Sequence, residues 1–230
     1  MPGSGCLGGH KEPVIRDRTD FEQYPWDEIE KRYFERYTPY FKSLAKNMPK
    51  GMKAIGGVGN GIFECVQEIV SFMQLCYISV DDRQLYSDLF PNAYEVSYRI
   101  WKRFLDEFGD LYCVVRFGDD LGYKVSTLLP VQDIREEIIP RYQKLVALIH
   151  AYHKPFLLHS CGCIFDLMDD LINIVKIDAK HSNEDAIAPF SYWVEKYGDK
   201  IGNFGGIDTD AVCRLSRQEM REYIAEVIQK

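Results

Sequence analysis

A strict alternation of short apolar runs with longer amphipathic segments is the feature that most limits the fold of this chain. Each apolar run is followed by polar or glycine-rich residues. Strands that alternate with helices in this way pair in parallel, and the helices form the crossovers between them. The predicted strands are 52–58, 111–117, 156–160, 174–179 and 201–207. The predicted helices are 62–79, 83–107, 133–152, 164–172, 184–197 and 217–229.

The positions of the polar residues separate the two architectures that fit this alternation, an open doubly wound sheet and a (β/α)8 barrel. Four consecutive strands end in polar groups, which begin at Gly118, His159, Lys180 and Gly205. A barrel distributes its active site over the loops after many strands, whereas an open sheet concentrates it at one crevice. The pattern therefore favours an α/β chain of the TIM (β/α)8-barrel type.

The barrel expected from this sequence is incomplete. Five strands are predicted where a full barrel has eight, and the N-terminal strands and the last strand are expected to be absent. Residues 1–26 are rich in Gly and Pro and lack a sustained period, which predicts an irregular lead-in. Residues 27–230 are then expected to form a single barrel-like domain.

Composition limits the partners and the location of the chain. A formal charge of −7 argues against nucleic acid and anionic membranes as main partners, because both reward clustered Lys and Arg. No apolar run approaches the roughly 18 residues of a membrane span, and the N-terminus lacks the basic and apolar regions of an export signal. A cytoplasmic location is expected. Seven cysteines in such a chain are expected to be free thiols or metal ligands.

The segment from Phe156 to Cys163 contains the strongest chemical signal. His159 and Cys161 are two residues apart at a strand end, so their side chains point to the same side. Imidazole nitrogen and thiolate sulfur are ligands that zinc prefers. Cys163 could join the same ion only if the chain folds back at Gly162. The alternative is a buried histidine and cysteine that the backbone satisfies.

Carboxylates and a further histidine follow the other strands. One of Asp119 and Asp120 is expected to face the barrel mouth, as a substrate anchor, proton donor or further metal ligand. The alternative is an Asx-turn around Gly122. His181 could contact substrate from the next loop, where Ser182 or Asn183 is expected to cap the following helix. Asp208 is a secondary candidate of the same kind.

Five motifs in order resemble those of the uroporphyrinogen decarboxylase superfamily, and within it most resemble the corrinoid-linked methyltransferase branch. The resemblance runs from about Ile15 to the C-terminal residue and includes the entry Arg16-Asp17…Tyr24-Pro25-Trp26. The five motifs are Gly118-Asp-Asp-Leu-Gly, Pro140-Arg-Tyr, Pro155-Phe-Leu-Leu-His159-Ser-Cys161-Gly162, Ile177-Asp-Ala-Lys-His181-Ser-Asn-Glu-Asp185 and Gly205-Gly206-Ile-Asp208.

The resemblance implies a TIM barrel with its active site at the C-terminal mouth. It implies that His159 and Cys161 ligate zinc, which holds a thiol as thiolate for attack on the methyl group of a methylcobamide. In that branch the third ligand is a cysteine near the last barrel strand, which neither Cys163 nor Cys213 matches. The third ligand is left open, with Cys163 and a residue outside this chain as the alternatives.

The resemblance also implies roles for the remaining candidates and a set of partners. Asp119, Asp120 and His181 are expected to be catalytic, and Gly118 and Asp208 to contact substrate. The expected partners are a small thiol or a tetrapyrrole or corrinoid substrate, a corrinoid protein, and further copies of the chain in a homo-oligomer. Two other functions remain open: metal-free decarboxylation of the uroporphyrinogen type, and a non-catalytic corrinoid-binding barrel.

Overall fold

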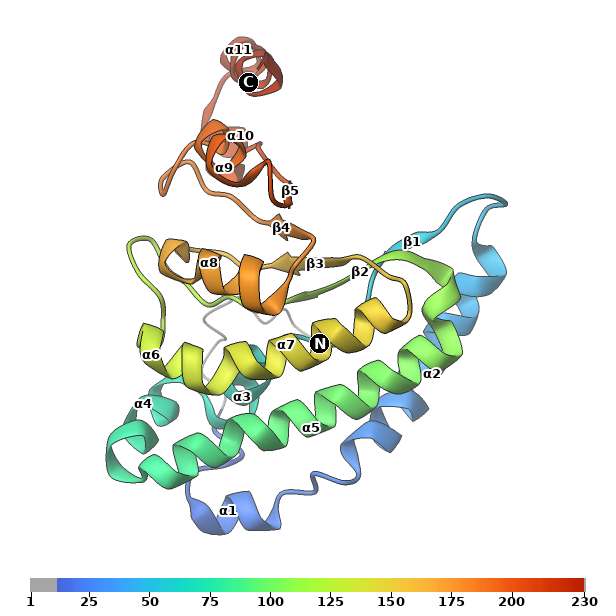
Figure 1. The fold of residues 1–230 in the computed structure, drawn as a ribbon, viewed down its shortest axis with the longest axis vertical. Coiled ribbons are helices and arrows are strands. Elements are labelled where there is room, and N and C mark those ends of the chain that lie inside the picture. Colours follow the sequence, from blue (N-terminus) through green and yellow to red (C-terminus); the bar gives the residue numbers. More distant parts are fainter. Residues whose placement is uncertain (1–11, 230) are drawn as a thin grey trace.

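The computed structural model describes residues 12–229, and its centre is a five-stranded parallel sheet (Figure 1). The strands lie side by side in sequence order, each joined to the next through helical segments. This arrangement is that of part of a (β/α)8-type barrel and confirms the predicted fold class. Cys6 and the N-terminal residues that bear on the export prediction lie outside the described residues. The strands are β1 Ala54–Gly56, β2 Tyr112–Gly118, β3 Phe156–His159, β4 Ala179–His181 and β5 Gly202–Asn203.

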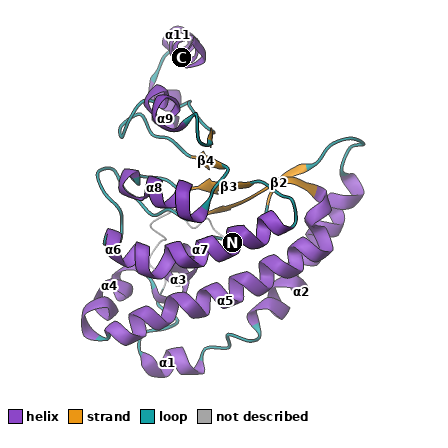
Figure 2. Cartoon of the chain, viewed as in Figure 1, coloured by secondary structure: helices purple, strands orange, loops and turns teal. Residues whose placement is uncertain are grey.

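Helices account for most of the remaining chain (Figure 2). None of those described combines the length and the apolar character that crossing a membrane requires. Short 3-10 turns are η1 Gly109–Leu111 and η3 Phe165–Leu167, and single π-helical turns are η2 Ile134–Ile138 and η4 Leu171–Val175. The α-helices are α1 Arg18–Gln23, α2 Ile29–Asn47, α3 Ile62–Val70, α4 Phe72–Asp81, α5 Arg83–Phe108, α6 Val131–Asp133, α7 Ile139–Ala151, α8 Met168–Asp170, α9 Phe190–Tyr197, α10 Thr209–Arg214 and α11 Arg217–Gln229.

One face of the sheet is covered by helices. Helices α5 and α7 lie on the same side of β2 and β3 (Figure 1). The ring of Phe117 on β2 packs against Trp101 of α5 and Tyr142 of α7, with ring centroids 6.2 and 5.2 Å apart. Phe117 and its strand neighbour Val115 are almost completely buried. The hydrophobic core therefore lies between this face and the helices.

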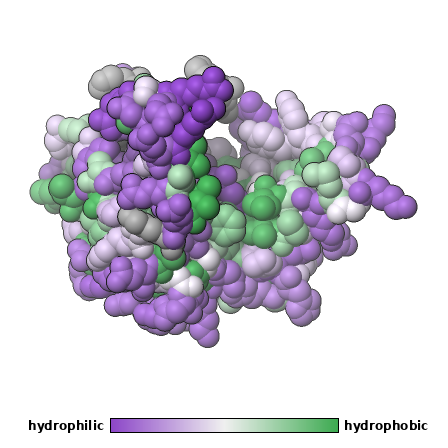
Figure 3. Space-filling model, turned by 90° about the horizontal axis from the view of Figure 1, so that it is seen from above, coloured by the Kyte–Doolittle hydropathy of each residue, from purple (hydrophilic) through white to green (hydrophobic). Residues whose placement is uncertain are grey.

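The other side of the molecule is more open. Seen from above, its surface is hollowed between hydrophilic flanks, and hydrophobic side chains lie along the hollow (Figure 3). Ile55 of β1 is 55% exposed, and Arg116 of β2 is also exposed. Because Arg116 lies between Val115 and Phe117, strand alternation turns its side chain away from the covered face.

Several predicted boundaries are wrong, and each error has a local cause. The single helix predicted for 62–79 is divided at Ser71, whose φ is 66° and whose hydroxyl accepts from the Gln74 N–H. Residues 174 and 175 belong to η4 rather than to a strand, and the left-handed Lys176 ends that turn. Strand β4 therefore starts only at Ala179. The fifth strand is shorter than predicted and ends at Asn203.

The terminal segments also differ from their predictions. Helix α1 lies inside the lead-in predicted to be irregular, so that prediction is wrong for residues 18–23. The helix predicted from residue 184 begins at Phe190, because Pro189 occupies its N-cap position. Ser182 and Asn183 therefore do not cap it, contrary to prediction. Helix α10 was not predicted, although Asp208 before it is a good N-cap.

Candidate metal centre

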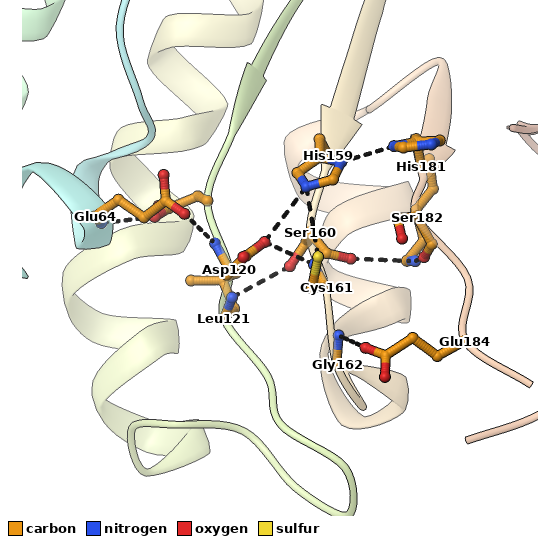
Figure 4. Close-up of polar contacts among 12 residues, drawn as sticks. Glu64, Asp120, Leu121, His159, Ser160, Cys161, Gly162, His181, Ser182 and Glu184 are labelled. Carbon is orange, nitrogen blue, oxygen red and sulfur yellow. Dashed lines mark hydrogen bonds and ion pairs between the residues drawn. The ribbon is translucent and has the colours of Figure 1, made fainter. Parts of the chain in front are cut away.

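The carboxyl ends of β2, β3 and β4 bring the predicted site residues together. The strand register places Gly118, His159 and His181 side by side. Residues in register on parallel strands share a face, so both histidines project on the same side of the sheet. Figure 4 shows His159 between Asp120 on one side and His181 on the other. The backbone joins the same loops, because the Asp119 N–H donates to the His159 carbonyl and the Ser160 N–H to that of His181.

Asp120, His159 and Cys161 form the group suited to a metal ion within residues 12–229. One ligand atom from each lies within 4.8 Å of the others. His159 Nε2 is 3.5 Å from Cys161 Sγ and 3.6 Å from Asp120 Oδ1. The Cys161 N–H donates to Asp120 Oδ1 at 2.8 Å, which holds the carboxylate against the loop that carries the thiol. Two of these residues were predicted as ligands, and Asp120 was predicted as a catalytic residue.

The spacing of these atoms fits zinc. Zinc bonds of about 2.0–2.3 Å at tetrahedral angles put neighbouring donor atoms roughly 3.3–3.8 Å apart. Both distances from His159 Nε2 fall in this range. Nitrogen, sulfur and carboxylate oxygen are all zinc ligands, and three protein ligands leave one position for a substrate, as in catalytic zinc sites. Cys163 is not in the group; its N–H donates to the Tyr123 carbonyl at 2.6 Å.

The two histidines are linked through their Nδ1 atoms, which are 2.7 Å apart. Burial lowers the pKa of His159, and the nearby Arg116 and Lys180 act in the same direction against Asp120. Burial also lowers the pKa of His181, aided by His159, Arg116 and Lys180. Both rings are therefore neutral at pH 7, and the contact of His159 with Asp120 is not an ion pair.

Neutral rings suit a metal site. One Nδ1 must donate the hydrogen bond and the other must accept it. If His159 carries its proton on Nδ1, its Nε2 has a free lone pair that faces Asp120 and Cys161. His181 Nδ1 then accepts this hydrogen bond and orients the His159 ring. Metal-bound histidines commonly have such an outer partner.

Asp119 has a different environment from its neighbour Asp120. Its side chain is completely buried and accepts hydrogen bonds from the backbone N–H groups of Phe63 and Glu64, at 3.0 and 2.7 Å, and from the Tyr142 hydroxyl. It therefore caps the N-terminus of α3, whose own N-cap residue is a glycine. Burial raises the pKa of Asp119 to about 6, against the effect of these donors.

Glu64 is a titratable group that the sequence analysis missed. It lies in the first turn of α3, and its Oε1 accepts from the Asp120 N–H at 3.4 Å. Burial, followed by the charges of Asp119 and Asp120, raises the pKa of Glu64 to about 8. The available signal was a glutamate three residues after the glycine-rich 56–61 loop. Its carboxyl group is therefore largely protonated at pH 7.

The remaining predicted residues have identifiable structural surroundings. A Cβ at Gly118 would lie 3.2 Å from the His159 ring, so glycine leaves room for the histidine. Asp208 accepts from the N–H groups of Asp185, Asp210 and Ala211, which places it as the N-cap of α10. Neither residue belongs to the metal group. Their predicted contacts with substrate stay predictions, as does a catalytic role for Asp119 and His181.

The glycine-rich loop before α3 needs its small residues for close packing. A Cβ at Gly61 would lie 2.2 Å from the Cβ of Asp119, and one at Gly57 would lie 2.4 Å from the Arg116 carbonyl oxygen. The Gly61 N–H donates to the Gly118 carbonyl at 2.5 Å. Close approach of the backbone to β2 therefore accounts for these glycines.

Comparisons with known proteins identify the fold. A scan against protein-family models finds no match, and a search of curated proteins finds none either. Among solved structures, a methyltransferase from Methanosarcina mazei has a similar fold, with a TM-score of 0.55 and 20% sequence identity. The similarity covers 71% of this chain and 46% of the methyltransferase. The chain thus spans less than half the length of that protein, and the likeness is one of fold.

Proposed function

We propose that this chain belongs to a zinc-dependent methyltransferase that moves a methyl group from a methylcobamide to a thiol. The observation that carries the proposal is the Asp120, His159 and Cys161 group, whose donor atoms have the spacing of a zinc site. The sequence motifs and the fold shared with a methyltransferase support the same reaction class. The uroporphyrinogen decarboxylase superfamily, the corrinoid donor and the zinc ion are all parts of this proposal.

A bound zinc ion would keep the acceptor thiol as a thiolate near neutral pH, which makes its sulfur a strong nucleophile. The residues of the chain prepare this site. Cys161 and Asp120 would supply a sulfur and an oxygen ligand, and the Cys161 N–H fixes the carboxylate. His159 supplies a neutral nitrogen that His181 orients. These three residues would hold the metal and would leave one position for the thiol.

The transfer itself balances without a further reagent. The thiolate sulfur forms a bond to the methyl carbon while the cobalt–carbon bond of the methylcobamide breaks and leaves its electron pair on cobalt. The products are a methyl thioether and the reduced cobamide. Both substrates are expected to approach from the hollowed side of the molecule (Figure 3).

The test is methyl transfer from methylcobalamin to 2-mercaptoethanol by the reduced, zinc-loaded protein. The rate is given by the loss of methylcobalamin absorbance and by the formation of the thioether, which mass spectrometry measures. We expect turnover by the wild type and at least about a hundredfold less by Cys161→Ser, which loses a ligand. A Cys163→Ser variant is the matched control and should keep the rate. Equal rates for wild type and Cys161→Ser would refute the proposal, and release of CO₂ from a porphyrinogen acid would replace it with decarboxylation.

A further inference from the structure

Lys180 is a charged residue of β4 with no exposed surface. It is the middle residue of β4, in register with the buried Leu158, and strand alternation turns it away from the side of His181. Its ammonium nitrogen lies 4.3 Å from the ring centroid of Trp193 on α9. Lysine is almost never fully buried unless specific groups compensate its charge. Specific contacts of Lys180 must therefore compensate its buried charge.

The ammonium group of Lys180 joins two loops. It donates to the carbonyl oxygens of Ser160 and Ser182, at 3.4 and 2.5 Å, and to Asn183 Oδ1 at 3.4 Å. Ser160 follows β3 and Ser182 follows β4. No carboxylate within residues 12–229 forms an ion pair with Lys180. Three neutral oxygens and an aromatic face hold the charge, so an oriented set of acceptors replaces a counterion.

The two carbonyl groups lie next to the candidate metal centre. Ser160 is the residue between His159 and Cys161, so its peptide carbonyl sets the direction in which the chain presents the thiol. Ser182 follows His181, whose Nδ1 contacts His159. The Ser160 hydroxyl also accepts from the Leu121 N–H at 3.2 Å, directly after Asp120. Each member of the metal group is thus next in sequence to a residue of this cluster: Asp120 precedes Leu121, and Ser160 lies between His159 and Cys161.

We propose that Lys180 is a positioning residue, whose buried ammonium ties the loop after β3 to the loop after β4 and so fixes His159 and Cys161 for metal binding. The inference rests on the proposed function in one respect, that these residues bind a metal. It extends that proposal to a residue that touches neither the metal group nor the substrate side. The lysine acts from the covered face through two peptide carbonyls.

The charge of Lys180 adds to this effect. Burial lowers the pKa of Lys180 to about 8, and the nearby Cys161, Glu184 and Asp120 oppose that shift. The ammonium form therefore predominates at pH 7. A cation favours the negatively charged forms of nearby groups at short range in a poorly hydrated interior.

The experiment compares zinc affinity with stability in Lys180→Met, which keeps the length of the side chain but removes the donors and the charge. Zinc dissociation constants are measured by competition with a chromophoric chelator, and the unfolding temperature is measured on the metal-free protein. Lys196→Met is the matched control, because Lys196 lies over the Tyr192 and Tyr197 rings of α9 and its hydrogen bond goes to the Tyr192 hydroxyl rather than to a loop carbonyl. Lys180→Arg restores the charge and the donors.

We expect Lys180→Met to bind zinc about 10–100-fold more weakly, the usual effect of losing an outer-shell partner. Its metal-free unfolding temperature should stay within about 4 °C of the wild type. The Lys196→Met variant should bind as the wild type does, and Lys180→Arg should recover most of the affinity. If the role of Lys180 were only structural, Lys180→Met would lower the unfolding temperature and would not affect zinc affinity separately from stability.

Unchanged zinc affinity in a folded Lys180→Met would overturn the inference and leave the proposed function intact. If the Met variant does not fold, the same comparison is made with Lys180→Gln. We expect this variant to bind zinc more weakly than the wild type, and wild-type affinity would contradict the inference. If the wild type itself binds no zinc, the proposed function and the role of Lys180 are both refuted. The two failures are therefore distinguishable in one set of titrations.

Discussion

The two sides of the central sheet differ in what their residues contribute. On the covered side, Phe117 is 1% exposed and packs between helices α5 and α7. On the other side, the His159 side chain is 22% exposed and belongs to the metal group. Burial of apolar surface stabilises the fold, whereas exposure gives ligands access to substrate. Stability and chemistry are thus divided between neighbouring positions of the same strands.

The adjacent carboxylates Asp119 and Asp120 show the same division within two residues. Asp119 caps α3 from inside the helical layer, and Asp120 faces His159 and Cys161. Apart from Lys180, which acts through loop carbonyls, a substitution should therefore affect stability or metal binding according to the side on which it falls. The predictions below test this separation.

The largest effect is expected from Phe117→Ala. Removal of the buried ring leaves a cavity between Trp101, Tyr142 and the sheet, and should lower the free energy of unfolding by about 3–5 kcal/mol. Ile55→Ala is the control, because Ile55 is 55% exposed and should cost about 1 kcal/mol or less. Urea unfolding measures both. Equal losses would show that the two sides of the sheet do not differ in this way.

Cys161→Ser should have the next largest effect, on metal binding rather than on stability. Loss of the thiolate should weaken zinc binding at least about a hundredfold, or roughly 2.7 kcal/mol. Cys163→Ser should leave the affinity unchanged, because Cys163 lies outside the group. Isothermal titration with zinc gives both constants. If Cys163→Ser lost zinc affinity and Cys161→Ser did not, Cys163 rather than Cys161 would be the zinc ligand.

The pH dependence of stability should change in Asp119→Asn. Burial raises the pKa of Asp119 from 3.8 to about 6, so the folded state binds more protons than the unfolded state between these values. Stability from this group is therefore lost as pH rises from about 4 to 6, by at most roughly 3 kcal/mol. Asparagine does not titrate and removes this loss.

Urea unfolding at pH 4, 5, 6 and 7 measures this difference. The stability of the wild type minus that of Asp119→Asn should fall across the interval and become constant near neutral pH. A difference that rises with pH would mean that the N–H and hydroxyl donors to Asp119 outweigh its burial. The covered carboxylate would then behave like an ordinary helix cap.

The smallest effect is expected from Tyr142→Phe. The Tyr142 hydroxyl donates to Asp119 in a fully buried position, and its loss should cost about 1–2 kcal/mol of unfolding free energy. Zinc affinity should stay within about threefold of the wild type, because Tyr142 is on α7, away from the metal group. Chemical denaturation and zinc titration check the two parts. A large loss of zinc affinity would show that the two carboxylates act as one unit.

The sequence was sufficient to predict the order and parallel pairing of the five strands, because short apolar runs alternate with amphipathic segments throughout. It also predicted that His159 and Cys161 face the same way, since strand geometry fixes that relation locally. It left open which of Asp119 and Asp120 faces the mouth. That choice depends on α3, whose N-terminal N–H groups take one of the two carboxylates.

What the sequence did not predict depends on contacts between distant segments. The sequence analysis placed Lys180 at the start of the polar group after the fourth predicted strand, and only the packing of α9 and the two loops shows that it is buried. Glu64 is far from Asp120 in sequence but adjacent to it in the fold. The fourth strand was placed too early because Ile174 and Val175, apolar residues with strand preference, lie in a π-helical turn instead.

The most direct test of the central claim is X-ray absorption at the zinc edge of the purified, reduced, zinc-loaded protein. Asp120, His159 and Cys161 predict one zinc per chain, with a first shell of one sulfur at about 2.3 Å and nitrogen or oxygen atoms at about 2.0–2.2 Å. Asp120→Asn should change the oxygen contribution and leave the sulfur in place. A shell with two or more sulfurs from a single chain, or a folded protein that retains no zinc, would contradict the account.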